Sequence, residues 1–286
     1  MKPNSQPWQS KLILLLVLPV VGCGLVLESY DWFAGAPAVV YWTLSLGAAL
    51  GIVTLALRAA TPFAALTGAA ITAQLMYATA ATPYHAWRTY LIPVLAVSLL
   101  AFAATRAGRT KKEQLGTAEA RHGRSSAQVA ANLGAAALVS TGLFESWAVN
   151  SSWLPHSATA LLAASLAAMA EAAADTVSSE IGQVLGGRPR MITTLRQVDP
   201  GTDGGITFAG SLAGVAAAAI VAALGSFAVH ADVRFFLIAT AGSVFGLFFD
   251  SLLGATLERK RWLNNDAVNF LSTVSAAAFA LIVIAI

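Results

Sequence analysis

The chain is poor in charge: only 11% of its 286 residues are Asp, Glu, Lys or Arg, whereas 57% are hydrophobic. A soluble domain is usually about 25% charged. A soluble chain with so few charges could not cover its apolar core with polar surface, so the composition excludes ordinary soluble enzymes. It predicts an all-α, polytopic transmembrane helix bundle. We expect one integral-membrane domain over residues 1–286, in the cytoplasmic or plasma membrane of a prokaryote.

Soft metal ligands and nucleotide-binding motifs are also scarce. The single cysteine, Cys23, lies in an apolar run, so it forms neither an internal disulfide nor a zinc site. The four histidines are scattered without ligand spacing. Neither a GxxxxGK[ST] loop nor the protein-kinase motifs occur. The sequence therefore argues against redox chemistry at cysteine and against a soluble-type ATP site.

Long apolar runs, in contrast, are abundant. A membrane helix needs roughly 20 mostly apolar residues. Nine segments meet this expectation, at about 11–28, 38–58, 62–81, 89–106, 127–147, 157–184, 205–229, 233–257 and 265–286. The first four, within residues 1–104, are simple apolar runs, whereas residues 105–286 carry embedded polar side chains and sequence motifs. We expect the second part to be the catalytic one.

The basic residues predict the orientation. With the N-terminus in the cytoplasm and the C-terminus outside, every Lys and Arg except Arg88 and Arg234 falls on the cytoplasmic side. This agrees with the positive-inside rule. Basic residues placed in this way favour the lipid bilayer as a partner and do not indicate nucleic acid. The two long polar connections, 105–126 and 185–205, are both cytoplasmic, so we expect the chemistry at that face.

Three carboxylates interrupt the apolar segment that contains EAAADTVSSEIG. At about 100° per residue, Glu171, Asp175 and Ser178 share one stripe with Gly182, and Glu180 points almost the opposite way. A charge at the bilayer centre costs at least about 2.5–3.5 kcal/mol, so such residues usually face a cavity or a partner. A structural ion pair or hydrogen-bond anchor is the alternative for each acid, most of all for Glu180.

Other polar side chains are expected at the same depth. They are Asn132 in QVAANLG, Asp250 in GLFFDSLLGAT, and Asp266 and Asn269 in NNDAVNFLST. An N-cap at Asn264 or Asn265, with Asp266 in the first helical turn, is the alternative for the last motif. Scattered structural polar residues would not be expected to gather near one face of the membrane.

The loop DPGTDGG, residues 199–205, leads directly into an apolar segment. Glycines permit close backbone approach, and backbone amides ahead of a helix form an anion site. A plain turn is the alternative. Arg188 and Arg190 lie just upstream and could bind phosphate.

Carboxylates, amides and arginines together predict phosphoryl or nucleotidyl transfer with Mg²⁺, which usually binds one or two carboxylates plus phosphate oxygens. We assign Asp175, Asp250 and Asp266 to the metal. The catalytic residues would be Asp175, Asp250, Asp266 and Asn269. Phosphate would be bound by Arg188, Arg190, Asp203, Gly204, Gly205, Asn132 and Ser178, with Glu171 and Glu180 as secondary residues.

Five stretches resemble a known family. They are residues 105–132, EAAADTVSSEIGQVLGGRPRMITT (171–194), VDPGTDGGIT (198–207), FDSLLGAT (249–256) and NNDAVNFLST (264–273). They are similar to the integral-membrane family of domain of unknown function 92, which includes the phytyl-phosphate kinases. The resemblance implies a membrane kinase that adds a phosphate to a prenyl monophosphate, with CTP or ATP as the donor. On the motifs it carries over Asp175, Glu180, Asp203, Asp250, Asp266 and Asn269.

Two other functions stay open. A transporter or flippase of a phosphorylated lipid or small anion would also use intramembrane acids, but it needs a polar path across the membrane. A structural scaffold leaves acids at one depth unexplained.

Overall fold

The structure is a computed structural model that describes residues 7–117, 123–151 and 157–284. Lys2, Arg121, His122 and His156 lie outside these ranges. Nine helices coincide with the nine expected apolar segments among the described residues. They are α1 (Pro7–Gly35), α2 (Pro37–Ala56), α3 (Pro62–Tyr77), α4 (Leu91–Arg106), α6 (Ser126–Val139), α8 (Ala158–Leu185), α9 (Phe208–Ala228), α10 (Val233–Leu253) and α11 (Asn265–Ile284). The expected all-α bundle is confirmed.

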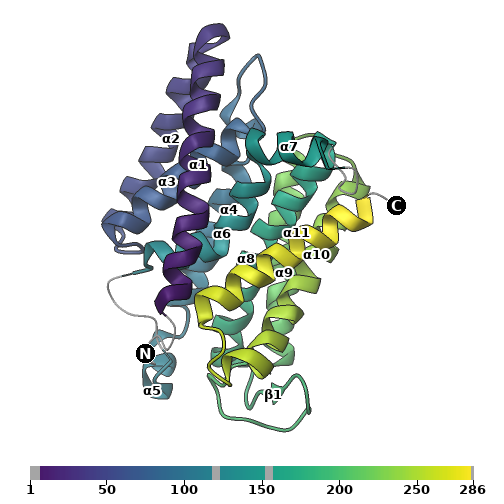
Figure 1. Cartoon of the computed structure of the whole chain (residues 1–286). Coiled ribbons are helices and arrows are strands. Elements are labelled where there is room, and N and C mark those ends of the chain that lie inside the picture. Colours follow the sequence, from purple (N-terminus) through teal and green to yellow (C-terminus); the bar gives the residue numbers. More distant parts are fainter. Residues whose placement is uncertain (1–6, 118–122, 152–156, 285–286) are drawn as a thin grey trace.

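Shorter elements complete the described chain. They are the 3₁₀-helix η1 (Ala86–Arg88), α5 (Arg109–Leu115), α7 (Gly142–Val149), the π-helix η2 (Gly254–Glu258) and two antiparallel strands, β1 (Arg190–Met191) and β2 (Gly205–Ile206). Figure 1 shows α5 and β1 at the lower end of the bundle, near the N-terminal end. The two expected cytoplasmic connections therefore lie at the same end of the molecule.

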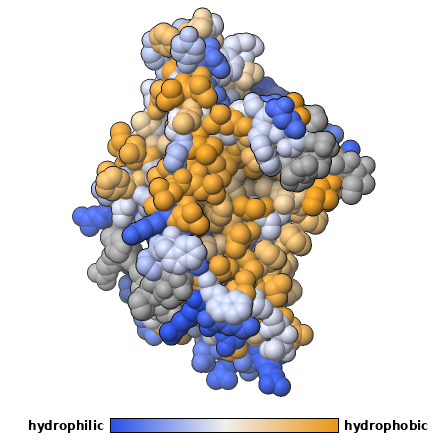
Figure 2. Space-filling view, viewed as in Figure 1, coloured by the Kyte–Doolittle hydropathy of each residue, from blue (hydrophilic) through white to orange (hydrophobic). Residues whose placement is uncertain are grey.

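Six described helices are long and apolar enough to cross a membrane: α1, α2, α8, α9, α10 with η2, and α11. The number rises to eight if α4 with α5, bent by 63°, and α6 with α7, bent by 52°, each form one span. The α3 helix has 16 residues, so the count of nine spans stays a prediction. Figure 2 shows hydrophobic side chains over the middle of the visible face and hydrophilic ones at its lower end, as expected for a multi-pass membrane protein.

Several expected boundaries differ from those of the helices. The first helix runs from Pro7 to Gly35 and is longer than the expected 11–28. The segment 127–147 is broken between α6 and α7, where the hydroxyl of Thr141 accepts a hydrogen bond from the amide of Phe144 (3.1 Å) and starts a new helix. A side-chain cap of this kind competes with a continuous helix.

The α8 helix lies at the centre of the bundle, with α4, α6, α9, α10 and α11 packed around it (Figure 1). Its inner stretch is mostly alanine, and small side chains allow neighbouring helices to approach closely. On α9, a Cβ atom added at Gly210 would lie 2.5 Å from the carbonyl oxygen of Ser178. This packing places the acids of α8 inside the protein and away from lipid.

Candidate functional site

A polar cavity of about 330 Å³ lies between α6, α8, α10, α11 and the loop that joins α8 to α9. This loop carries β1, at the lower end of the bundle in Figure 1. Many of the residues singled out in the sequence line the cavity: Asn132, Asp175, Ser178, Glu180, Asp203, Gly204, Gly205, Asp250 and Asn269. The fold therefore brings polar groups from distant parts of the chain to one place.

Four of the expected site residues lie elsewhere. Glu171, Arg188, Arg190 and Asp266 are not among the residues that line the cavity. Arg188 and Arg190 are exposed, and the guanidinium of Arg190 donates to the carbonyl oxygen of Leu195 (2.9 Å). The structure therefore does not bring these two arginines to the acids of the cavity.

Asp266 is used for a helix contact. Its carboxylate accepts a hydrogen bond from the hydroxyl of Ser10 in α1 at 2.6 Å. The side chain of Asn264 accepts from the amide of Ala267 (2.8 Å) and also donates to Ser10 (3.1 Å). Asn264 is thus the N-cap of α11, the alternative left open by the sequence, and Asn265 lines the cavity. The structure does not bring Asp266 to Asp175 and Asp250.

Asp175 of α8 and Asp250 of α10 face the cavity from opposite helices. One oxygen of Asp250, Oδ2, is buried without a hydrogen-bond partner within the described ranges. Asp250 also lies close enough to Asp175 and Glu171 for their negative charges to repel it. Carboxylates of like charge in a buried position are unfavourable unless a cation or a proton balances them.

A metal ion could use this pair. Within residues 7–117, 123–151 and 157–284, no three His, Cys, Asp or Glu side chains form a group that could hold a metal. Mg²⁺, however, commonly takes only one or two carboxylates and completes its shell with phosphate oxygens and water. Asp175 and Asp250 fit that mode of binding, since one carboxylate oxygen of Asp250 has no hydrogen-bond partner within the described residues.

Glu171 lies on α8 one helical turn before Asp175, which lines the cavity. Its side chain is 1% exposed, and it packs against Gly246 of α10, where an added Cβ atom would lie 2.6 Å from the Glu171 Cγ atom. The small residue at Gly246 therefore makes room for a buried carboxylate. Glu171 itself does not line the cavity.

Arg124 is the cation that sequence reasoning missed as a site residue. Its backbone pairs with the α2–α3 connection: its amide donates to the carbonyl oxygen of Ala59 (2.9 Å), and its carbonyl oxygen accepts from the amide of Thr61 (3.0 Å). Its guanidinium reaches the hydroxyl of Thr176 (3.4 Å) and lies close enough to attract Asp175. The capping box of Ser125 and Gln128 marks the start of α6 directly after Arg124, but it does not show that this cation lies beside the acids.

Glu180 forms an ion pair, which is the structural alternative left open by the sequence. Its carboxylate accepts from the ammonium group of Lys112 at 2.6 Å. Lys112 is 1% exposed and also donates to the carbonyl oxygens of Ala104 and Thr105 at the end of α4. This pair ties α5 to α4 and α8 at the edge of the cavity.

The glycine-rich loop forms one wall of the cavity. Gly204 has φ +77°, and a Cβ atom added there would lie 2.5 Å from the backbone nitrogen of Ala255. Ala255 belongs to η2, the π-helical turn that follows Asp250. Such turns are frequent at functional sites. Gly204 is therefore required because the loop packs closely on η2. The sequence did not predict this contact.

Further lining residues were not singled out as site residues. They are Arg124, Gln128, Thr176, Ser179, Gln183, Thr202, Thr207, Ser251, Glu258 and Asn265. Most carry hydroxyl or amide groups, which suit phosphate, ribose or base recognition by hydrogen bonds.

Comparison with known proteins identifies the family. The family described as integral membrane protein DUF92 matches residues 47–277. The chain belongs to this family. The DUF92 match contains the whole polar cavity and confirms the resemblance drawn from the sequence motifs. It also agrees with a multi-pass location in the membrane. No solved structure matches the chain significantly.

Three curated proteins that are similar to this chain come from two prokaryotes and one plant. An uncharacterized membrane protein of Methanocaldococcus jannaschii is 43% identical over 38% of this chain and 45% of its own length. An uncharacterized membrane protein of Synechocystis is 34% identical over 68% of this chain and 73% of its own length. The chloroplastic protein VTE6 of Arabidopsis thaliana is 29% identical over 65% of this chain and 57% of its own length.

Proposed function

We propose that this chain is a membrane kinase that transfers a phosphate from a nucleoside triphosphate, CTP or ATP, to a prenyl monophosphate at the cytoplasmic face. Distant homology to VTE6 and to the DUF92 family suggests a membrane kinase-like function. The observation that carries the proposal is the polar cavity, where Asp175, Asp250 and Arg124 meet a glycine-rich loop.

The proposed reaction requires little acid–base chemistry. An oxygen of the acceptor monophosphate attacks the terminal phosphorus, the bond to the bridging oxygen breaks, and the nucleoside diphosphate leaves with that electron pair. The acceptor oxygen is already anionic, so no general base is needed. Positioning and charge neutralisation therefore supply most of the catalysis.

Each group of the cavity has a corresponding role in this proposal. Asp175 and Asp250 would hold Mg²⁺, which supplies charge neutralisation at the phosphates when bound. Arg124 would bind a phosphate oxygen, because a fixed guanidinium is the side chain best suited to such oxygens. Asn132 and Asn269, whose amides lie 3.4 Å apart, would orient the acceptor or the nucleotide by hydrogen bonds.

Transport has less support. From Glu171 toward the N-terminal end of α8, the next polar side chain is Ser165. Its hydroxyl donates a hydrogen bond to the carbonyl oxygen of Ala136 (3.0 Å). The surrounding stretch of α8 is buried Ala, Leu and Met. A polar path across the membrane would need more hydrogen-bonding groups along this central helix.

The test is phosphate transfer by purified protein in proteoliposomes. Radiolabelled CTP or ATP is offered with a panel of prenyl alcohols and prenyl monophosphates, with Mg²⁺ and after chelation. We expect Mg²⁺-dependent labelling of a monophosphate. Asp175→Asn and Asp250→Asn should each lower the rate by about 100-fold or more, because a charge that stabilises the transition state is lost.

Asp31→Asn is the matched control. Asp31 is exposed near the far end of α1, outside the cavity, and this variant should keep the normal rate. Full Mg²⁺-dependent transfer in both cavity variants would mean that the site is misplaced. Proton-coupled or counter-flow uptake without nucleotide would favour the transporter.

A further inference from the structure

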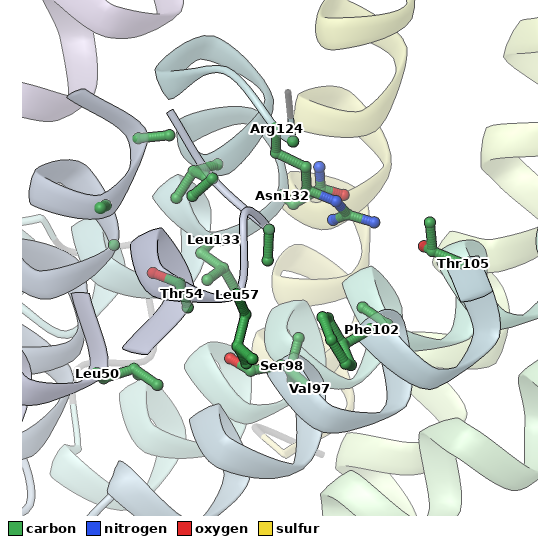
Figure 3. A pocket seen from close by; sticks show the side chains of 18 of the residues that line it. Leu50, Thr54, Leu57, Val97, Ser98, Phe102, Thr105, Arg124, Asn132 and Leu133 are labelled. Carbon is green, nitrogen blue, oxygen red and sulfur yellow. The ribbon is translucent and has the colours of Figure 1, made fainter. Parts of the chain in front are cut away.

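A second cavity, of about 450 Å³, lies between α2, α3, α4 and α6. Figure 3 shows its apolar side chains, with Leu50, Leu57 and Val97 on one side and Arg124 with Asn132 at one end. The walls also contain Ala and Gly from α2, α3 and α4. Its volume falls in the range of about 300–1,000 Å³ that is typical of small-molecule sites.

Cations gather around this apolar space. The side chains of Arg58, Arg106, Arg109 and Arg124 all line it, and no Asp or Glu is among its lining residues. The guanidinium of Arg106 lies 4.2 Å from the ring centre of Phe102 and donates to the carbonyl oxygen of Leu57 (3.2 Å). An apolar cavity rimmed by cations matches an amphiphile with an anionic head and a hydrocarbon chain.

The two cavities share two residues, Arg124 and Asn132. The backbone of Arg124 is fixed by the α2–α3 connection, and its side chain lies beside Thr176 and Asp175. A phosphate bound at Arg124 would therefore lie at the boundary. From there it would face the acids on one side, while a chain attached to it lies among apolar side chains on the other.

We propose that this second cavity binds the hydrocarbon chain of the lipid monophosphate, with its phosphate held by Arg124 where the two cavities meet. The proposal rests on the proposed function, since it names the place of that reaction's acceptor. A free anion does not match the whole cavity, because it leaves the apolar wall uncovered. A neutral lipid does not match it either, because it brings no negative charge to a lining that carries four arginines and no Asp or Glu. Leu57, Arg58 and Arg106 are exposed, so the rim of the cavity is open to a molecule arriving from the bilayer.

Gly68 offers a way to fill the cavity without disturbing the helices. It lines the cavity, and a Cβ atom added there would meet only Val129, at 3.9 Å. The side chain of Gly68→Phe would extend into the cavity. Gly22→Phe on α1 is the matched control, because this glycine is exposed and an added Cβ atom meets nothing within 4 Å.

The experiment measures binding and transfer separately. In proteoliposomes without nucleotide, geranylgeranyl monophosphate with a photoreactive diazirine at its chain end is cross-linked, and the labelled peptides are identified. We expect labels on α2, α3, α4 or α6, and a loss of labelling of about tenfold or more in Gly68→Phe but not in Gly22→Phe. With nucleotide, Gly68→Phe should lower kcat/KM for this long chain far more than for geranyl monophosphate, whose chain is half as long.

The outcomes separate this proposal from the proposed function. Labelling of the cavity that Gly68→Phe abolishes, without any phosphate transfer, would support the lipid site and refute the kinase. Transfer that Gly68→Phe leaves unchanged for both chain lengths, or labels confined to other helices, would overturn the lipid site and leave the kinase standing. Equal labelling with the unphosphorylated alcohol would overturn the role of Arg124.

Discussion

At the scale of single residues, the buried ion pair between Lys112 and Glu180 is expected to stabilise the fold. Glu180→Gln leaves the ammonium of Lys112 buried beside neutral acceptors. We expect a loss of about 3 kcal/mol in the free energy of unfolding, since breaking one side of a buried ion pair leaves an uncompensated charge. Thermal unfolding of the purified protein in detergent measures the loss as a lower Tm.

Glu113→Gln provides the matched control. Glu113 pairs with Arg109 on the exposed side of α5, where the side chains are 43% and 39% exposed. An exposed pair contributes about 0–1 kcal/mol, so this variant should have nearly the normal Tm. Equal effects of the two substitutions would show that Lys112 does not depend on Glu180.

Some site residues could be predicted from the sequence and others could not. Asp175 and Asp250 could be singled out because a charge within an apolar run is costly wherever it lies in a membrane protein. Arg124 and Lys112 could not, because basic residues are common in any polar connection on the cytoplasmic side. Their importance depends on which distant segment lies beside them: α8 in both cases. Asp266 had the same pattern as the cavity acids, and only the position of Ser10 distinguishes it.

At the scale of elements, the close packing of α9 on α8 supports the floor of the polar cavity. A Cβ atom at Gly210 would lie 2.5 Å from the carbonyl oxygen of Ser178 and 3.0 Å from the Cα atom of Gly182. Gly210→Ala must therefore move one helix, and we expect a loss of about 1–3 kcal/mol, as for other overpacked sites. The Tm of the purified variant should fall accordingly.

The same substitution on α1 tests whether the effect is due to packing. Gly22→Ala adds its methyl group where nothing lies within 4 Å. Alanine is favoured over glycine in a helix by up to about 1 kcal/mol, so this variant should be unchanged or slightly more stable. If Gly210→Ala were as stable as Gly22→Ala, α8 and α9 would not pack as closely as the structure has them.

The elements that the sequence predicted are those with a strong apolar signal. Nine helices among the described residues coincide with the expected apolar segments, because a run of apolar residues is the main sequence signal of a membrane helix. The break at Thr141, the hairpin of β1 and β2, and the π-helix after Asp250 depend on local hydrogen bonds. These bonds leave little trace in composition. The packing of Gly204 on η2, which forms one wall of the cavity, was therefore not predictable. The sequence indicated only that the glycine-rich loop belongs to the site.

At the scale of the whole molecule, the fold gathers at one end the segments that the charge pattern predicts to be cytoplasmic. The sequence placed the acids and most basic residues on the cytoplasmic side from charge counts alone. The fold brings α5, the β1 hairpin and the polar cavity to one end of the bundle without any reference to charge (Figure 1). If this end is cytoplasmic, as the charge pattern predicts, the polar cavity faces the side on which nucleoside triphosphates are available.

The single cysteine makes this orientation directly testable. In a Cys23→Ser background, new cysteines are introduced one at a time at two exposed positions, Ala81 in the α3–η1 connection and Thr193 in the hairpin loop. In intact cells, a membrane-impermeant maleimide should label Ala81→Cys and should label Thr193→Cys only after the membrane is permeabilised. Labelling of Thr193→Cys in intact cells would place the polar cavity on the outer side. That result would remove the nucleotide supply on which the proposed kinase depends, whereas labelling of both positions in intact cells would require a different number of spans between them.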